Sequence, residues 1–256
     1  MSGRGVRYST ADGVATVVFD RPEAHNAMTM AMYDQLAEAC AAIAADSNVR
    51  VATFRGTGQA FVAGTDIHEF MAFDCADDGI VYERRIDEVI SAIEGLPVPT
   101  IAVIEGAAMG GGLLIAAACD LRIATPAGRF GVPIARTVGN CLSLANTARI
   151  VSVLGPVRAK RLLLLADSLS AEEALSCGFV VEVVQPEGIE EALNAMCRQL
   201  VSHAPITMRV AKESIRRLSG ALPEGDDLIR IAYASSDFKT GVRAFLTKQR
   251  PQWTGR

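Results

Sequence analysis

A glycine-rich stretch from Ile101 to Ala118 has the composition of a site that binds negative charge. Residues 101–104 are small or β-branched and apolar, which predicts a buried strand. Gly106 and the consecutive glycines 110–112 predict a turn, and strong helix formers follow. A strand that turns through glycine into a helix leaves free backbone N–H groups at the helix start, where the helix dipole also favours an anion. The stretch therefore predicts a phosphate site or an oxyanion hole, in which N–H donors stabilise a negative oxygen.

The nucleotide-binding alternatives can be tested on the same residues. No Gly-Lys-Ser/Thr follows the glycines, which excludes a P-loop. The spacing of Gly106 and glycines 110–112 is not that of a dinucleotide-binding fingerprint, and the next acid, Asp120, follows too soon to reach a ribose. Two interpretations stay open. The glycines only let a helix pack closely on a sheet, or they form an oxyanion hole whose second donor comes from elsewhere in the chain.

Length, composition and charge limit the class of protein. A chain of 256 residues can bury one full core with a small additional region. Half of the residues are hydrophobic, which favours surfaces buried between subunits. The net charge of −4, without a basic run, predicts neither a nucleic-acid partner nor a membrane partner. Because we find no apolar targeting region and no apolar stretch long enough to span a bilayer, we expect a cytoplasmic protein.

The cysteines and histidines show no spacing typical of a metal site. No two of the six cysteines form a Cys-x-x-Cys pair, and none lies at ligand spacing to one of the three histidines. We expect six buried free thiols, no bound metal and no cofactor.

Alternating strand and helix patterns predict the fold class. Asp12-Gly13 between apolar runs predicts a hairpin, and Thr29 is a candidate N-cap for a helix to Ala45. The further predicted elements are strands Val49–Arg55, Leu121–Ala124 and Val180–Val184, and helices Tyr82–Leu96, Ser143–Leu154, Val157–Leu165 and Ser170–Gly178. We expect a mobile loop at residues 72–79 and irregular structure at 127–139. This order predicts an α/β core with mainly parallel strands.

The last quarter of the chain differs from the rest, because only helical patterns follow Ile189. We therefore divide the chain into a core, residues 1–200, and a C-terminal helical region, residues 201–256. With no strand left to cover, the apolar positions of this region favour an intersubunit surface. These positions are Ile206, Val210, Ile215, Leu218, Leu228, Ile231, Val242 and Leu246.

Several motifs together resemble the crotonase, or enoyl-CoA hydratase/isomerase, superfamily. They occur in the family's order across nearly the whole chain: Asp20-Arg21-Pro22…Asn26-Ala27, Phe61–Ile67, Gly106–Gly112…Cys119-Asp120, Ser170–Ala174…Gly178–Val180 and Gly241–Leu246. The resemblance implies a crotonase-like spiral of β-β-α units with a C-terminal helical trimerisation region, assembled as a homotrimer or a dimer of trimers. It also implies an acyl-CoA substrate, so that coenzyme A enters as part of the substrate.

The resemblance also supplies the second donor of an oxyanion hole. The two backbone N–H groups that the family uses map onto Thr65 and Gly111, and losing one such donor typically costs about 3 kcal/mol. Since only its backbone is implicated, the side chain of Thr65 is predicted to be dispensable. The loops that resemble those holding coenzyme A give further candidate substrate-binding residues: Ala24, His25, Asn26, Ala63, Gly64, Asp66, Ile67 and Gly110.

The sequence departs from the family at the positions of its catalytic acids. The two glutamates of the hydratases map onto Leu114 and Ile134, and an acidic position of some isomerases and dehalogenases maps onto Leu142. Hydration needs a base for water and an acid for the α-carbon, so the sequence argues against ordinary hydration. The remaining acyl-pocket candidates are Arg136, Asn140 and Cys141, each weighed against a plainer role as a solvated arginine, a loop amide and a packed thiol.

Three functions stay open at this point. The first is an acyl-CoA enzyme of the hydratase/isomerase family that stabilises a thioester enolate. The second is a malonyl-type acyl-CoA decarboxylase, since that reaction needs the same stabilisation and a site that disfavours the carboxylate, which Leu114 and Ile134 would suit. The third is a non-catalytic acyl-CoA-binding protein that has kept the scaffold and lost the acids.

Overall fold

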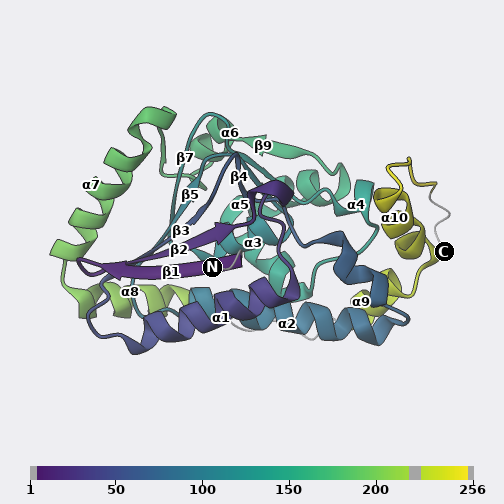
Figure 1. Cartoon of the computed structure of the whole chain (residues 1–256), viewed down its shortest axis with the longest axis horizontal. Coiled ribbons are helices and arrows are strands. Elements are labelled where there is room, and N and C mark those ends of the chain that lie inside the picture. Colours follow the sequence, from purple (N-terminus) through teal and green to yellow (C-terminus); the bar gives the residue numbers. More distant parts are fainter. Residues whose placement is uncertain (1–4, 219–225, 253–256) are drawn as a thin grey trace.

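The computed structural model describes residues 5–218 and 226–252, which form two sheets and the helices around them (Figure 1). The larger sheet has the order β1 (Gly5–Ala11), β2 (Val14–Asp20), β3 (Val51–Gly56), β5 (Thr100–Ile104), β7 (Leu121–Ala124), β10 (Glu182–Val183). The smaller sheet has the order β4 (Ala60–Val62), β6 (Ala107–Met109), β8 (Arg129–Gly131), β9 (Ser168–Ser170). Only the pairs β1–β2 and β8–β9 are antiparallel within the described ranges, so the predicted, mainly parallel α/β core is confirmed.

The chain alternates between the two sheets and then adds a helix. The units are β3-β4-α2, β5-β6-α3 and β7-β8-α5, each giving one strand to each sheet. The helices are α1 (Met30–Ala45), α2 (Ala76–Glu94), α3 (Gly111–Ala118), α4 (Ile134–Thr137), α5 (Leu144–Leu164), α6 (Ala171–Ser176), α7 (Ile189–Ser202), α8 (Pro205–Leu218), α9 (Asp226–Tyr233) and α10 (Ser236–Leu246). Three short 3-10 helices complete the elements: η1 (Pro22–Ala24), η2 (Ile67–Ala72) and η3 (Pro186–Gly188). This repeat is the spiral of β-β-α units that the resemblance to the crotonase superfamily implies.

The local signals for turns and caps act as predicted. Asp12 and Gly13 adopt positive φ angles in the hairpin turn between β1 and β2. The Thr29 hydroxyl accepts a hydrogen bond from the Met32 N–H and caps α1, as Ser170 does for α6 in a capping box. Gly155, with φ +76°, interrupts α5 between the two helices expected there.

Two segments expected to be irregular are ordered, so those predictions are wrong. The supposed loop at 72–79 contains the first turn of α2, where the Asp78 carboxylate accepts hydrogen bonds from the N–H groups of Asp74 and Cys75. Acidic residues here stabilise a helix start, because the N–H groups exposed there attract negative charge. The segment 127–139 contains β8 and α4, which are too short to produce a periodic pattern.

The core lies between the larger sheet and the helices that cover it, with α1 and α2 running side by side along one edge of the molecule (Figure 1). A second apolar cluster lies where α7 contacts the sheet, with Leu193 and Cys197 beside Val51, Ile101 and Ile123. The helices α1, α2 and α7 therefore each have a sheet or another helix to cover their apolar side.

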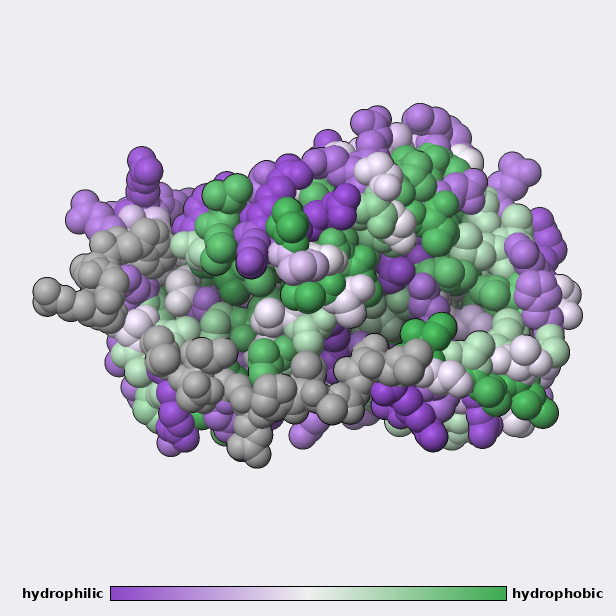
Figure 2. All heavy atoms as spheres, turned by 180° about the vertical axis from the view of Figure 1, so that it is seen from behind, coloured by the Kyte–Doolittle hydropathy of each residue, from purple (hydrophilic) through white to green (hydrophobic). Residues whose placement is uncertain are grey.

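The C-terminal helices contribute to both the core and the surface. Val242 of α10 and Tyr233 of α9 are buried in the main core. In contrast, Ile206, Val210 and Ile215 of α8 are 76%, 57% and 67% exposed. Figure 2 shows that hydrophobic residues reach the surface at several places on one face of the molecule. The predicted apolar tail therefore divides into residues that pack within the chain and a face of α8 that is open to solvent. The side chains at 218, 228 and 231 lie outside the described residues.

The cysteines carry no disulfide, and one expectation about them is wrong. All six are free thiols, but Cys75 is exposed, and Cys141 and Cys177 are only partly buried.

No helix in the described ranges is both long and apolar enough to cross a membrane. Within those ranges, no group of three or more His, Cys, Asp or Glu side chains is arranged to hold a metal ion.

Candidate active site

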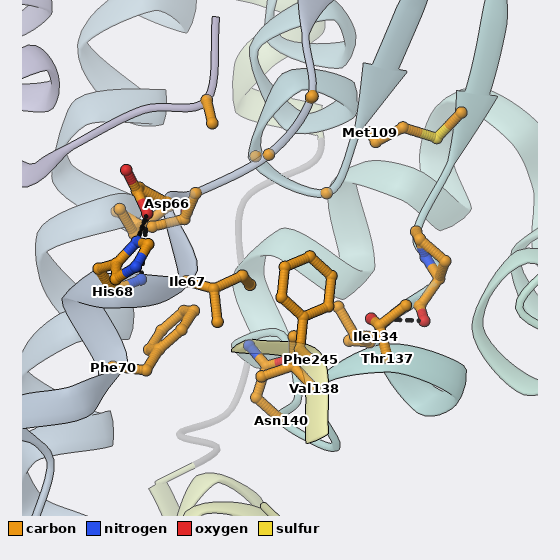
Figure 3. Close-up of a pocket in the computed structure, with 18 of the residues that line it drawn as sticks. Asp66, Ile67, His68, Phe70, Met109, Ile134, Thr137, Val138, Asn140 and Phe245 are labelled. Carbon is orange, nitrogen blue, oxygen red and sulfur yellow. Dashed lines mark hydrogen bonds and ion pairs between the residues drawn. The ribbon is translucent and has the colours of Figure 1, made fainter. Parts of the chain in front are cut away.

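A cavity of about 420 Å³ lies between the two glycine turns and is closed by residues from α2, α3, α4 and α10 (Figure 3). Most of the predicted site residues line it: Ala24, His25, Ala63, Gly64, Thr65, Asp66, Ile67, Gly110, Gly111, Leu114, Ile134, Asn140 and Leu142. Residues predicted from four separate segments thus meet at one cavity. Its wall is largely apolar, which suits an acyl chain.

The two glycine turns touch each other because neither carries a side chain at the contact. Gly64 and Gly110 have φ angles of +112° and +50°, which L side chains rarely adopt. A Cβ atom on Gly110 would lie 3.7 Å from the Cα of Gly64. One on Gly111 would lie 3.6 Å from the Thr65 Oγ1. The backbones of residues 64–65 and 110–111 are therefore close neighbours at the cavity wall.

Both proposed donors of the oxyanion hole are free within the described structure. In residues 5–218 and 226–252, neither the Thr65 N–H nor the Gly111 N–H donates a hydrogen bond to the protein. Gly111 is the first residue of the eight-residue helix α3, so its N–H has no partner inside the helix. Met28 fixes the other turn, since its N–H donates to the Gly64 carbonyl and its carbonyl accepts from the Asp66 N–H. Two unpaired backbone donors thus lie on one cavity.

The Thr65 side chain has a role that the sequence prediction missed. Its Oγ1 lies 2.9 Å from the Tyr33 hydroxyl and 2.6 Å from the Tyr82 hydroxyl. Both phenols are buried, and burial raises the pKa of each above its ordinary value, so both stay neutral. The side chain therefore connects α1 to α2 behind the oxyanion turn, a structural role beside the backbone role that the sequence analysis assigns to this residue.

Charged groups at one side of the cavity are tied to Asp66. Its carboxylate pairs with Arg21 at 2.7 Å and with the Nδ1 of His68 at 2.8 Å. Burial alone would raise the pKa of Asp66, but hydrogen bonds from His68 and Arg21 lower it below its ordinary value. His68 itself is 72% exposed. Figure 3 shows Asp66 and His68 at the edge of the apolar wall that includes Ile67.

Three predicted residues do not line the cavity. Asn26 is fully buried, and its Nδ2 donates to the carbonyls of Thr57 and Ala60 at 2.8 Å each, so it shapes the loop rather than the wall. Arg136 is exposed on α4. Cys141 is packed against the core, and burial raises the pKa of its thiol to about 12. For Arg136 and Cys141 the structure matches the plainer alternatives, a solvated arginine and a packed thiol.

The positions of the family acids are part of the apolar wall. Leu114 of α3 is 2% exposed, and Ile134 begins α4. Ile134, Val138 and Phe245 lie together in Figure 3, with Phe70 on the opposite side of the cavity. No carboxyl group can come from the two glutamate positions, so an acid or base must come from another element.

The sequence analysis missed one such group, Glu83 of α2. It lines the cavity, yet its residue is only 2% exposed. Its Oε1 accepts from the Tyr233 hydroxyl at 2.9 Å, and its Oε2 accepts from the Ser143 N–H at 2.8 Å. Burial raises the pKa of Glu83 to about 8, despite these hydrogen bonds. The sequence contains a signal for this inward position, because Glu83 precedes the inward-facing Ile86 by three residues and so lies on the same side of the helix.

The chain is similar to known proteins both in sequence and in structure. The sequence matches the enoyl-CoA hydratase/isomerase family over residues 9–256. It is 31% identical over 243 residues to the short-chain-enoyl-CoA hydratase of Clostridium acetobutylicum, covering 93% of this chain and 92% of the relative. It is 30% identical over 252 residues to the 1,2-epoxyphenylacetyl-CoA isomerase of Escherichia coli, covering 95% and 96%. A methylmalonyl-CoA decarboxylase solved with 2-nitronate-propionyl-CoA is 26% identical, with a TM-score of 0.90 over 98% of this chain and 99% of that one.

Proposed function

Because the chain belongs to the enoyl-CoA hydratase/isomerase family, we propose that it converts an acyl-CoA thioester through an enolate held by the N–H groups of Thr65 and Gly111. The observation that carries the proposal is the pair of unpaired N–H donors on touching glycine turns at one apolar cavity. When an enolate forms, negative charge develops on the thioester oxygen. Fixed donors aimed at that oxygen stabilise it more than they stabilise the uncharged thioester, which lowers the barrier.

Decarboxylation of a malonyl-type CoA ester is the second candidate. In this reaction the bond from the α-carbon to the carboxylate breaks, carbon dioxide leaves, and the electron pair forms the same enolate. The aliphatic side chains of Leu114 and Ile134 favour it, because an apolar wall disfavours a bound carboxylate. The similarity to a methylmalonyl-CoA decarboxylase over the full length of both chains also supports it.

We predict that the protein binds CoA thioesters but hydrates crotonyl-CoA poorly. The cavity offers no carboxyl from positions 114 and 134, so the acid and base that water addition needs are missing from their usual places. Calorimetry should detect acyl-CoA binding, while hydration should stay well below about 10 s⁻¹, a typical enzymatic turnover.

One panel of substrates tests both proposals. The protein is incubated with crotonyl-CoA, a 3-enoyl-CoA and methylmalonyl-CoA, and the products are identified by mass spectrometry. Isomerisation of the 3-enoyl-CoA or loss of carbon dioxide from methylmalonyl-CoA would each identify an enolate reaction. Fast hydration of crotonyl-CoA would contradict the prediction above. Binding without conversion of any of the three would favour the non-catalytic alternative.

For the assembly, we propose a homotrimer or a dimer of trimers in which α8 contributes to the interface. Lys212 fixes this helix to the core, since its Nζ lies 2.7 Å from the Asp120 carboxylate, while Ile206 and Val210 point into solvent. We predict that Ile206→Asp lowers the mass measured by light scattering, because a charge at an apolar contact is costly to bury. An intact chain that is already a stable monomer would show the proposal to be wrong.

A further inference from the structure

Among the described residues, two carboxyl side chains line the cavity, those of Asp66 and Glu83. The two differ in whether a positively charged group pairs with them. Asp66 is held as a carboxylate by Arg21 and His68. Glu83 has no cationic partner within the described ranges, and only neutral groups donate to it. A carboxyl that is buried without a positive charge can exchange a proton near neutral pH, whereas one that is paired with an arginine cannot.

The contacts of Glu83 leave room for a substrate. A carboxylate has about four lone-pair positions, and the Tyr233 hydroxyl and the Ser143 N–H use two of them. The amide of Asn140, which lines the same cavity, bonds at one end to the Tyr233 hydroxyl at 3.3 Å. The other end of this amide is buried without a partner in the described structure. Glu83, Tyr233 and Asn140 thus form a hydrogen-bonded polar group, named here the carboxyl cluster, of which Glu83 and Asn140 line the cavity.

We propose that Glu83 is the catalytic acid–base residue of this site and moves the proton at the α-carbon of the bound thioester. This inference rests on the enolate chemistry proposed above. As a base, the Glu83 carboxylate removes an α-proton, the C–H electron pair moves into the enolate, and the negative charge goes to the oxygen held by Thr65 and Gly111. As an acid, the Glu83 carboxyl gives a proton to the γ-carbon of the dienolate in the isomerisation of a 3-enoyl-CoA, and to the α-carbon of the enolate after loss of carbon dioxide. Isomerisation returns the proton that Glu83 removed, whereas after decarboxylation a proton from water restores the carboxyl.

Several elements determine the protonation state of Glu83. Tyr233 of α9 and Ser143, just before α5, donate hydrogen bonds that favour the carboxylate. Asp87, one turn further along α2, opposes it by charge repulsion, and Arg149 of α5 compensates by pairing with Asp87 at 3.2 Å. Tyr33, Tyr82 and Cys141 also lie within electrostatic range, and burial keeps all three neutral by raising their pKa values. Burial is the largest effect, and the resulting pKa of about 8 leaves Glu83 mainly protonated at pH 7.

The test is deuterium exchange at the α-carbon of butyryl-CoA in D₂O, followed by mass spectrometry. When a base forms the enolate, the α-hydrogen of the thioester is replaced by deuterium from the solvent, whatever the physiological substrate is. Because exchange begins with the carboxylate, the rate should rise about tenfold per pH unit below pH 8 and level off above it. Glu83→Gln should lower the rate about 100-fold, with binding of butyryl-CoA changed less than threefold.

Three variants separate a catalytic role from a structural one. Glu83→Asp should restore part of the exchange, since it keeps an ionisable group. Tyr233→Phe should move the midpoint of the pH profile upward, because it removes a hydrogen bond that stabilises the carboxylate. Glu105→Gln, at a glutamate that pairs with Arg55 and does not line the cavity, is the matched control and should exchange at the normal rate.

The outcomes distinguish this inference from the proposed function. Exchange that Gly111→Val abolishes but folded Glu83→Gln retains would overturn the role of Glu83 and leave the enolate proposal intact. A wild-type protein that binds butyryl-CoA without exchange would also overturn it. Failure of the wild type to bind any acyl-CoA would instead refute the proposed function. If Glu83→Gln does not fold, Glu83→Asp and the pH midpoint of Tyr233→Phe decide, and an unchanged midpoint counts against the inference.

Discussion

Replacing Gly111 by valine is expected to lower acyl-CoA conversion by roughly 100- to 1000-fold, the typical effect of losing an oxyanion-hole donor. A Cβ atom at this position would lie 2.3 Å from the hydroxyl oxygen of the buried Tyr33 side chain, so that side chain or the turn that carries the N–H must shift. The branched side chain also enters the space beside Thr65 where the thioester oxygen would bind. The measurement is turnover of whichever acyl-CoA the panel identifies, with circular dichroism to confirm the fold.

A double variant separates the clash from the loss of the donor. In Gly111→Ala alone, the new Cβ atom clashes with the same Tyr33 hydroxyl. Adding Tyr33→Phe removes that hydroxyl, and the nearest ring carbon then lies 3.6 Å from the Cβ atom, which is an ordinary contact. The double variant should therefore recover activity relative to Gly111→Ala. Full activity in folded Gly111→Val protein would exclude this N–H from the mechanism.

The second large effect is expected from Thr65→Pro, which deletes the other N–H donor. Gly64 precedes it, and glycine tolerates the restriction that proline places on the residue before it. We expect a loss of acyl-CoA conversion comparable to that of Gly111→Val, measured with the same substrate on folded protein.

Thr65→Ala is the control for this experiment, because it keeps the N–H. It leaves the buried hydroxyls of Tyr33 and Tyr82 without their shared partner, at a cost of about 1–3 kcal/mol in the free energy of unfolding. Urea denaturation should record that loss while most of the activity remains. If the alanine and proline variants lost activity equally at equal stability, the side chain rather than the N–H would be the important group.

The glycine turns could be predicted from sequence because their chemistry is local. Residues 101–118 specify a buried strand, a glycine turn and a helix within one short stretch, and the structure has β5 and α3 there, with the short strand β6 between them. The short elements β8, β9 and α4 could not be predicted in this way. Three or four residues show no period, and the partners of β8 come from elsewhere in the chain.

Glu83 was missed for a different reason. Its position in a helical pattern is visible in the sequence, but a glutamate in such a pattern is usually on the solvent side. Its burial depends on Tyr233, which lies 150 residues later in the chain, and on the loop at Ser143. The structural role of the Thr65 side chain was missed for the same reason, since its partners Tyr33 and Tyr82 come from two helices. Only the tertiary structure brings these groups together.

The last helix has a consequence for how ligand binding and stability are linked. Phe245 and Leu246 of α10 form part of the cavity wall, while Val242 of the same helix packs in the core. Any ligand that fills the cavity therefore binds only the state in which α10 is docked. It stabilises that state by RT ln(1 + [L]/Kd), which is about 2.7 kcal/mol when the ligand is at 100 times its Kd. A bound ligand should therefore make α10 undock less often and a protease cut that helix more slowly.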